Sequence, residues 1–484
     1  MIGELWSLPG LVALLPLLAA LFLPFLRHRA AAAWVCIGVA TASFALACRL
    51  PWEMRDGTLL LVDGVSAHAT LLTAFVGMTT AWFSRGYMAV EEASGRLDAP
   101  RLAKYHALFM GFLGAMLLAL LANNTGLAWV AVETATIAAV LVVELPRTEN
   151  ATEASWKFFL ICGVGIALAL FGTLLLYLAA VPATPGGGLA AMRWTALAQA
   201  APQAQGPLLT LAFVFLLLGY GTKAALAPLH GWMPDAHAEG PTPVSAVLAG
   251  SILNVALIFL LRVRGVMAAN AAAMAPGPPL MALGLLSVLL GSFGLWRRRD
   301  IKRFFAFSSV EQSGVVAVAF GLGGPAAVFA GLLHMTFHTL AKAAVFHCVG
   351  RISQMKGSQS FLGIGGLLGG HRLLALTLAA GMVAVAGLPP FGLFASEFLI
   401  VGEVVRRAPL AALPLGLGLV VGGWALAARL LDLCFAPATP DPGPVPGPLA
   451  LLPAWLHLAL VFILGFAMPA VVAAWFSDIA AGVR

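Results

Sequence analysis

The sequence has few charged side chains. Of 484 residues, 10% are Asp, Glu, Lys or Arg, whereas 61% are hydrophobic, and the mean hydropathy is +0.97. Soluble domains carry about 25% charged residues. This composition therefore excludes an ordinary soluble enzyme or binding domain and indicates an integral membrane protein. The pI near 9.5 then reflects basic loops beside a lipid bilayer and does not indicate a nucleic-acid partner.

Cysteine is also scarce. The five cysteines are scattered along the chain, and none belongs to a Cys-x-x-Cys pair: Cys36, Cys48, Cys162, Cys348 and Cys434. This pattern indicates neither a disulfide framework nor a metal or iron–sulfur site. The chain also has no phosphate-binding glycine loop and no flavin or quinone signature. We therefore expect no catalytic centre and no cofactor in this chain.

Long apolar runs, by contrast, are abundant. A run of about 20 residues can cross a hydrocarbon core about 30 Å thick. The sequence therefore predicts an all-α membrane protein with about fourteen spans. The predicted spans are 6–26, 31–50, 66–87, 105–122, 125–145, 157–181, 207–228, 242–263, 278–297, 301–322, 327–349, 372–405, 410–435 and 450–475.

The distribution of lysine and arginine predicts an orientation. The odd-numbered connections between spans are richer in these residues, and they include the segment 296–303, WRRRDIKR. The positive-inside rule places such connections in the cytoplasm and both termini outside. Five arginines oppose this assignment: Arg193, Arg262, Arg264, Arg406 and Arg407.

Four charged residues lie inside the predicted spans: Glu133, Lys223, Lys342 and Glu397. Each charge costs several kcal/mol in lipid, so it should face protein or water. A single such charge can be structural, either in an ion pair or at the interface. Four charges of both signs on four spans favour a path for protons. Glu144 returns to within about 20° of the helix face of Glu133, and it is either the cytoplasmic mouth of this path or an interfacial charge.

Histidines extend this pattern on the eleventh predicted span. His334, His338 and Lys342 are four residues apart and therefore share one helix face, which can hold a file of waters. The His-x-x-x-His spacing also suits a metal ion, but no third ligand lies nearby, so we do not expect a metal. His347 points away from this face, and ordinary packing accounts for it as well as a function would.

Helix-breaking residues accompany two of the charges. Gly221 and Pro228 flank Lys223, and the segment 387–392, GLPPFG, precedes Glu397. Broken helices at membrane depth occur only inside protein or beside water. The broken spans are the seventh and the twelfth, and an offset of five spans reverses the topology of the second copy, as in an inverted repeat of five-helix bundles. We therefore predict four segments: helices 1–3 at 1–104, a first repeat at 105–263, an inverted second repeat at 278–435, and a last helix at 450–484.

Five stretches carry a resemblance to a known family: WVAVETATIAAVLVV, GYGTKAALAPLHGWMPDAHAEGPTPVSAVLAGSILN, RRRDIKRFFAFSSVEQSG, HMTFHTLAKAAVFHCVG and GLPPFGLFASEFL. They cover most of residues 105–405. The chain resembles the antiporter-like membrane subunits shared by respiratory complex I, group 4 membrane-bound hydrogenases and multisubunit cation antiporters. The runs HAEGPTPVSAVL and ASWKFFLICGVGIALALFGTLLLY make it most similar to the hydrogenase-4 component F type, with the complex I subunit M type next.

The resemblance implies roles for the buried charges. In the family, a glutamate on the fifth span pairs with the lysine of the broken seventh span, which matches Glu133 and Lys223. A central basic group on the eleventh span matches Lys342, supported by the two histidines before it. A terminal Lys or Glu on the broken twelfth span passes the proton outward, which matches Glu397.

The same resemblance places residues between these groups. His230 and His237 lie in the loop after the seventh span, where they are expected to line a connecting water path. Complex I relatives often carry a lysine on the eighth span, whereas this chain has Asn254 there. Asn does not titrate near neutral pH, so a proton that crosses at this point must use water or a histidine.

The resemblance implies a proton-translocating membrane subunit of a redox-driven complex, hydrogenase-4/formate-hydrogenlyase-like or NADH:quinone oxidoreductase-like, in the bacterial inner membrane. The implied partners are other membrane subunits and a peripheral redox arm. That arm would carry iron–sulfur clusters and a nickel–iron site or flavin. Two alternatives stay open: a subunit of a cation/proton antiporter or inorganic-carbon uptake complex, and a structural membrane subunit that no longer conducts protons.

Overall fold

The computed structural model describes residues 2–26, 29–296 and 298–482, which form mostly helices. The N-terminal helices are α1 (Ile2–Leu5), α2 (Leu8–Phe22), α3 (Arg29–Ala47), α4 (Gly64–Ala93), α5 (Ala99–Leu121), α6 (Thr125–Val143) and α7 (Glu149–Ala180). The middle of the chain forms α8 (Trp194–Ala200), α9 (Gly206–Lys223), α10 (Met233–Glu239), α11 (Thr242–Val247), the π-helix η6 (Leu248–Ile252) and α12 (Leu253–Ala268).

The remaining helices are α13 (Gly277–Leu295), α14 (Ile301–Leu322), α15 (Pro325–Lys356), α16 (Leu367–Gly370), α17 (Arg372–Val385), α18 (Gly392–Arg407), α19 (Pro409–Phe435), α20 (Leu452–Phe466) and α21 (Ala470–Gly482). Short 3-10 turns are η1 (Leu23–Phe25), η2 (Leu50–Trp52), η3 (Val181–Ala183), η4 (Gly188–Met192), η5 (Ala201–Gln203), η7 (Phe361–Gly363) and η8 (Pro448–Leu451). Two short antiparallel strands, β1 (Arg55–Asp56) and β2 (Leu61–Val62), form a hairpin between α3 and α4.

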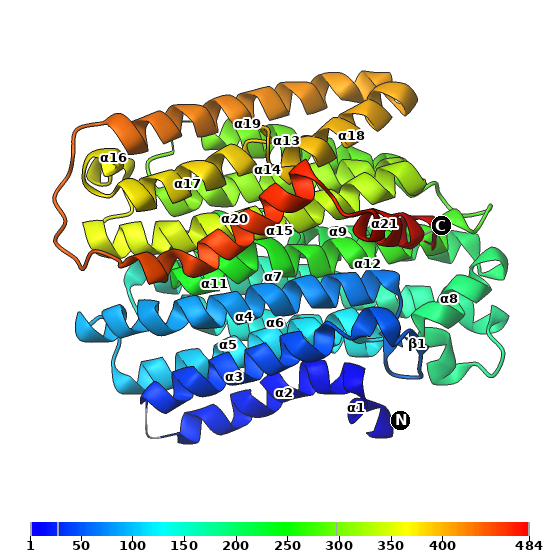
Figure 1. The fold of residues 1–484 in the computed structure, drawn as a ribbon. Coiled ribbons are helices and arrows are strands. Elements are labelled where there is room, and N and C mark those ends of the chain that lie inside the picture. The colour runs from blue at the N-terminus through cyan, green and yellow to red at the C-terminus, as the bar shows by residue number, and fades with distance from the viewer. Residues whose placement is uncertain (1, 27–28, 297, 483–484) are drawn as a thin grey trace.

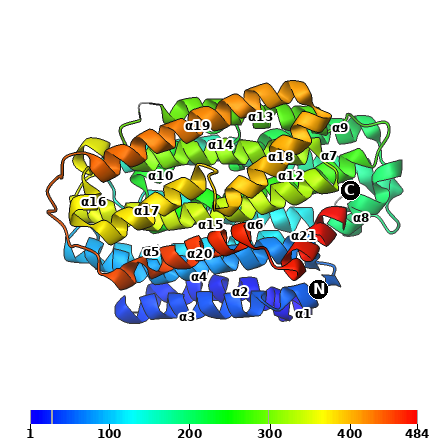
Figure 2. The ribbon, with the colours of Figure 1, turned by 45° about the horizontal axis from the view of Figure 1, so that its top comes forward.

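The helices lie side by side along one common direction (Figure 1). Both chain ends lie at the same end of this bundle, and the second view agrees (Figure 2). The connection from α19 to α20 and the short α16 lie at the opposite end (Figure 1). Because both chain ends lie at the same end of the bundle, the chain crosses the bundle an even number of times. This holds whichever end faces the cytoplasm.

Polar caps define where several helices begin. The Asp63 side chain accepts a hydrogen bond from the Ser66 N–H at 2.8 Å, and the Ser66 hydroxyl accepts one from the Asp63 N–H at 2.9 Å. This reciprocal capping box satisfies backbone donors that the first turn of α4 leaves free. At four more helix starts, those of α5, α6, α7 and α14, a side-chain oxygen accepts from backbone N–H groups of the first turn: Asp98, Asn124, Thr148 and Asp300.

Twelve helices of the described chain are long and apolar enough to cross a membrane, or thirteen if the bent pair Phe361–Gly370 and Arg372–Val385 counts as one span. The prediction of about fourteen differs from this number at two places. The third predicted span is α4, which is long enough at 30 residues but carries more polar side chains. The twelfth is divided into α17 and α18, neither of which reaches 18 residues.

The two predicted helix breaks are confirmed. In the first, α9 ends at Lys223, Ala225 adopts a φ of 52°, and the chain becomes helical again only at Met233. In the second, α17 ends at Val385 and Gly387 adopts a φ of 64° before α18 begins. Left-handed backbone cannot continue a right-handed helix. Each break therefore interrupts its helix. Residues 224–227 of the first break are buried, whereas residues 388–390 of the second are exposed.

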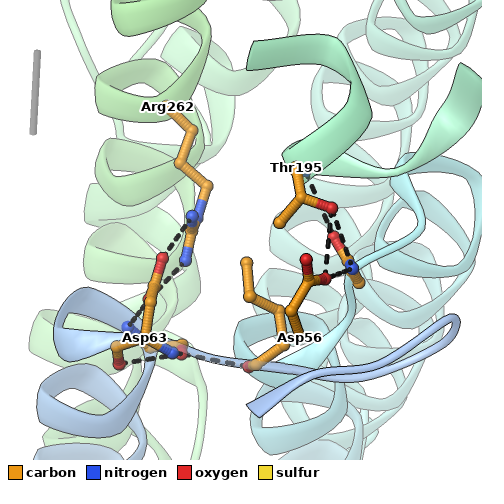
Figure 3. Close-up of polar contacts among 7 residues, drawn as sticks. Asp56, Asp63, Thr195 and Arg262 are labelled. Atoms are coloured by element: carbon orange, nitrogen blue, oxygen red, sulfur yellow. Dashed lines mark hydrogen bonds and ion pairs between the residues drawn. The ribbon is translucent and has the colours of Figure 1, made fainter. Parts of the chain in front are cut away.

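The hairpin between α3 and α4 is fastened to two distant parts of the chain (Figure 3). Arg262, on the last turns of α12, donates two hydrogen bonds to the Asp63 carboxylate, at 2.8 and 2.9 Å. Asn123 and Thr195 both donate to Asp56, at 2.9 and 3.2 Å. Arg262 is one of the five arginines on the side that the positive-inside rule predicts to be outside. In the structure its charge is neutralised by Asp63.

Candidate proton path

The first predicted centre joins α6 to the end of α9. The Lys223 side chain is fully buried, and its Nζ donates a hydrogen bond to the Thr136 hydroxyl at 2.5 Å. Glu133 lies one helical turn before Thr136, is half-buried, and is electrostatically coupled to Lys223. Within the described chain no ion pair within 4 Å joins these two charges. The predicted pair is therefore close in space but open in this conformation.

The second centre lies where α15 meets α14. Lys342 is fully buried, and its Nζ donates to the Phe305 carbonyl oxygen at 2.7 Å and lies 5.3 Å from the centre of the Phe305 ring. A backbone carbonyl can hold an ammonium group but cannot neutralise it. The charge that does act on Lys342 electrostatically is Glu311.

Glu311 is not among the residues predicted from the sequence. It lies in the middle of α14, 1% exposed, and its Oε2 has no hydrogen-bond partner among the described residues. Its carboxylate packs against Gly422 of α19, where any side chain would overlap with it. Glu311 interacts electrostatically with both Lys342 and Glu397. The criterion that selected Glu397, a charge inside an apolar span, would also have selected Glu311.

The two predicted histidines connect α15 to the second helix break. The ring of His334 bonds Gln312 through Nε2 at 2.6 Å and Ser396 through Nδ1 at 3.0 Å. His338 stacks on it with ring centres 6.5 Å apart and an angle of 9° between the planes. Its own Nε2 has no partner in the part of the chain that the structure describes. The predicted stripe on α15 therefore forms, and it points toward α14 and α18.

Glu397 lies at the end of this line. Its carboxylate packs against Gly387 of the second helix break, where a Cβ would overlap with it. The Gln312 side chain interacts with Glu397 as well as with His334. Gly387 has no side chain and therefore leaves room for the Glu397 carboxylate.

His237 links the second centre to one end of the bundle. Its ring is completely buried and stacks on Phe346 at 5.0 Å, and neither ring nitrogen has a described partner. It interacts electrostatically with Lys342 and with Lys302. The Nζ of Lys302, also buried, donates to the Gly240 carbonyl at 2.9 Å. Lys302 was not predicted from the sequence, because the basic run around it reads as a cytoplasmic loop.

Lys302 lines an open cavity of about 310 Å³ at this end of the bundle. Its polar lining residues include Tyr87, Glu91, Arg96, Glu239, Lys302 and Gln354. Burial raises the pKa of Glu239, the last residue of α10, although nearby Arg303 and Lys302 act in the opposite direction. A cavity with carboxylates at its wall and a buried lysine at its base suits proton uptake.

Two predicted residues lie away from these contacts. The Glu144 carboxylate accepts hydrogen bonds from Thr152 at 3.1 Å and Ser155 at 2.9 Å, both on α7. His230 is half-buried and meets the Phe307 ring edge-on at 6.0 Å. Neither residue is joined to the two centres by a hydrogen bond within the described part of the chain, and both alternatives for Glu144 stay open.

Asn254 bridges two helices instead of carrying a charge. Its side-chain amide donates to the Thr339 hydroxyl of α15 at 2.8 Å, directly after the π-helix η6. Thr339 in turn donates to the Met335 carbonyl at 2.7 Å. Asn254 therefore lies between α12 and the helix that carries Lys342, at the place where the sequence predicts a modified crossing. In the described residues, no group of three or more His, Cys, Asp or Glu could hold a metal ion.

Comparison with known proteins shows the family of this chain. A family model described as "NADH:quinone oxidoreductase/Mrp antiporter, TM" matches residues 122–421, which contain both helix breaks and all four predicted charges. The chain belongs to this family. This antiporter-like chain is also 48% identical over 420 residues to the "Hydrogenase-4 component F homolog" of Methylacidiphilum infernorum, covering 87% of this chain and 88% of that protein. The predicted similarity to the component F type is thereby confirmed.

Two solved complexes contain subunits with the same fold as this antiporter-like chain. A subunit of the membrane-bound sulfane sulfur reductase, an archaeal respiratory membrane complex, superposes with a TM-score of 0.87 at 21% identity, covering 99% of this chain and 98% of that one. A subunit of respiratory complex I from Thermus thermophilus gives 0.78 at 25% identity, covering 97% and 99%. The chain is therefore a multi-pass membrane protein of the predicted class.

Proposed function

We propose that this chain is a proton-translocating membrane subunit of a multisubunit redox-driven complex of the hydrogenase-4 or NADH:quinone oxidoreductase kind. The observation that carries the proposal is the row of buried ionisable groups along α6, α9, α14, α15 and α18. Burying a charge in an apolar bundle is energetically costly, so such charges mark functional sites by default. Lys223, Lys342 and Glu397 occupy three successive positions of this row, and His334 and Glu311 lie between the last two.

The first centre works as a switch in this proposal. Burial disfavours the charged form of a lysine, and a nearby carboxylate favours it. When Lys223 moves from Thr136 toward Glu133 it holds a proton, and when it returns to the hydroxyl it releases one. Moving one charge against 100 mV costs about 2.3 kcal/mol. Making or breaking one poorly hydrated ion pair is enough to drive such a step.

The second centre continues the path with the charges that face Lys342. Glu311 is the carboxylate that acts on Lys342, as Glu133 acts on Lys223. His338 and His334 then pass the proton on toward Glu397. Uptake begins at the cavity lined by Lys302 and Glu239 and proceeds through His237. Asn254 supplies a hydrogen bond but no titrating group, so the crossing between the centres uses water or histidine.

The proposed setting is a bacterial inner membrane with both termini on the outer face. Other membrane subunits and a peripheral arm are the proposed partners, and that arm holds the iron–sulfur clusters and a nickel–iron site or flavin. The proposed segments are the inverted five-helix repeats at 105–263 and 278–435, supported by the matching helix breaks. A second candidate is a subunit of a cation/proton antiporter or inorganic-carbon uptake complex, which the words "Mrp antiporter" in the family description favour.

Two experiments test the proposal. The first is to tag the chain, extract it gently and identify co-purifying proteins by mass spectrometry. A nickel–iron hydrogenase or quinone-reductase arm supports the redox-driven assignment. Recovery of small membrane subunits alone favours the antiporter assignment.

The second experiment compares Lys223→Met and Glu133→Gln in the assembled complex. Both variants should abolish coupled proton uptake into inverted vesicles while assembly persists. Lys157→Met is the matched control, because Lys157 is an exposed lysine that pairs with Glu153 at 2.6 Å. Wild-type uptake by both path variants would reject the switch.

A further inference from the structure

Helix α15 carries a second polar face that the proposed path does not use. Lys342 points toward α14, whereas His347, five residues later, points toward α4 and α20. The three helices α4, α15 and α20 pack against one another along this face and are neighbours in both views (Figures 1 and 2). Polar side chains on all three helices meet there.

The centre of this face is a pair of histidines. The rings of His347 and His457 lie edge to face with their centres 5.7 Å apart. His457 bonds the Thr79 hydroxyl through Nε2 at 2.7 Å, and His347 lies 3.4 Å from the Thr80 hydroxyl through the same atom. All four side chains are at most 2% exposed.

Each histidine of this pair has one free ring nitrogen. The Nδ1 atoms of His347 and His457 are buried without a hydrogen-bond partner among the described residues. Burying a polar atom without a partner is unfavourable, and packing alone would be served better by an apolar side chain. A ring with one bonded and one free nitrogen can take a proton at one atom and release the other proton from the opposite atom.

A line of contacts joins the pair to the cavity at Glu91. His347 stacks on Phe83 at 4.4 Å, and the Arg351 guanidinium lies over the same ring at 4.9 Å. Arg351 donates to the Gln354 side chain at 3.3 Å, and Gln354 donates to the Glu91 carboxylate at 2.7 Å. Glu91 and Gln354 both line the cavity of about 310 Å³.

Arg351 gives this line a gate. Its charge is permanent, and it stands between the cavity and His347, so it opposes a proton on the pair. Within the described residues its hydrogen bond goes to the Gln354 amide and not to a carboxylate. A fixed cation on a narrow polar route lowers proton passage.

Toward the opposite end of the bundle, α4 and α15 meet in one more polar contact. His68 bonds the Thr336 hydroxyl at 3.0 Å and packs against Phe476 of α21 with ring centres 4.7 Å apart. His68 precedes Thr79 by eleven residues, about 16 Å along α4. The polar face therefore extends beyond the histidine pair on the side away from the cavity.

We propose that α4, α15 and α20 form a second proton route, with the His347–His457 pair as its relay, the Glu91 cavity as its mouth and Arg351 as its gate. In each step an imidazole accepts a proton at Nδ1 and gives up the one at Nε2 to the adjoining threonine hydroxyl. The hydroxyl passes its own proton to a water molecule that enters the polar face, so the imidazole is neutral again and only its tautomer changes. A ring flip then resets the relay. The proposal rests on the proton-translocating function above. It shares the cavity at which the first path takes up protons, but beyond that cavity it uses none of the residues of the first path.

The test separates the two routes in the assembled complex, reconstituted in liposomes with a pH dye inside. With the driving reaction off, an imposed potassium diffusion potential drives passive proton flux. The double variant Lys223→Met, Lys342→Met closes the first path, because protons from the cavity reach Lys342 through His237 without passing Lys223, and it serves as the background. Adding Arg351→Gln should raise the remaining flux on the order of ten-fold, the change that one pKa unit represents. Adding His347→Gln and His457→Gln to that variant should return the flux to background.

The control is His106→Gln, because His106 is a buried histidine on α5 that contacts Cys36 and lies outside this face. It should leave the flux unchanged. An Arg351→Gln variant without increased flux, or an increase that survives loss of both histidines, overturns the second route. Coupled uptake in the Lys223→Met variant tests the first path separately. Normal coupled uptake there would instead overturn the proposed function.

Discussion

The Lys223 ammonium donates to the Thr136 hydroxyl at 2.5 Å, and Thr136 lies one turn of α6 beyond Glu133. The lysine that the sequence places at a broken helix is therefore held beside its predicted carboxylate but not on it. A hydroxyl satisfies an ammonium donor without adding a negative charge. In the proposed switch, this contact is the state in which the proton is least tightly held.

Replacing Thr136 should disturb this state directly. Thr136→Val keeps the shape of the side chain and removes the acceptor, so we expect Lys223 to shift toward Glu133 and hold its proton. Hydrogen bonds to charged groups contribute about 1.5–3 kcal/mol, which corresponds to a drop in coupled uptake of about ten-fold or more. The measurement is proton uptake per turnover in inverted vesicles.

Thr134→Val is the matched control for that experiment. Thr134 makes the same bond to a carbonyl four residues earlier, at 2.8 Å, as Thr136 does. It is exposed and does not accept from Lys223. Equal losses in the two variants would show that the effect comes from helix α6 and not from the switch.

Gly422 offers a second test, aimed at Glu311. A Cβ at Gly422 would overlap with the Glu311 carboxylate, so Gly422→Ala should push this carboxylate away from Lys342. We expect coupled uptake to fall by about ten-fold, the equivalent of one pKa unit, with assembly unchanged. Gly416→Ala, on the same helix with no atom near its Cβ, should behave as wild type. If Gly422→Ala also pumped normally, Glu311 would have no part in the path.

His237 can be tested by a change that preserves its packing. His237→Phe keeps a flat ring against Phe346 but removes both nitrogens, so the link from the cavity to Lys342 loses its proton acceptor. We expect coupled uptake to be lost while the thermal stability stays within a few degrees of wild type. His106→Phe makes the same substitution at a buried histidine outside the path, and it should retain uptake. Full uptake by His237→Phe would show that protons reach Lys342 from the cavity without His237.

The Asp63–Arg262 contact predicts a pH-dependent stability. Asp63 precedes α4, and although burial raises its pKa, the Arg262 guanidinium and the Ser66 N–H hold it below the ordinary value of 3.8. A depressed pKa stabilises the fold above the unfolded value and loses that effect as the pH falls through the folded value. Because the pair is partly exposed, Arg262→Met should cost only about 1 kcal/mol, or at most about 2–4 °C in Tm.

The corresponding measurement is the Tm of wild type and Arg262→Met in detergent across a pH series. The difference between them should be constant from pH 7 to pH 5 and shrink below about pH 4, where Asp63 is protonated first in the unfolded chain and then, at lower pH, in the folded protein. Asn123→Ala, which removes the neighbouring contact to Asp56, should change the Tm without this pH dependence at Asp63. A difference between wild type and Arg262→Met that is independent of pH would contradict the ionic role of Asp63.

Several properties of the chain follow from local sequence alone. Low charge and long apolar runs determine a membrane bundle, because each span must satisfy its own backbone within the helix. Glycine and proline around Lys223 and before Glu397 determine the two breaks for the same local reason. The stripe of His334, His338 and Lys342 depends only on helical periodicity. These features could be predicted, and the structure has them.

Other properties depended on which helices meet. The partner of Lys223, the packing of Glu311 against Gly422, and the burial of Lys302 under the α10 loop each join residues that are far apart in sequence. His347 could equally have been ordinary packing until α20 brought His457 within 5.7 Å of it. The sequence determined the class of the protein, its breaks and its buried charges. Only the tertiary structure decided which polar groups meet, because inter-helix contacts are set by packing between spans and not by any local pattern.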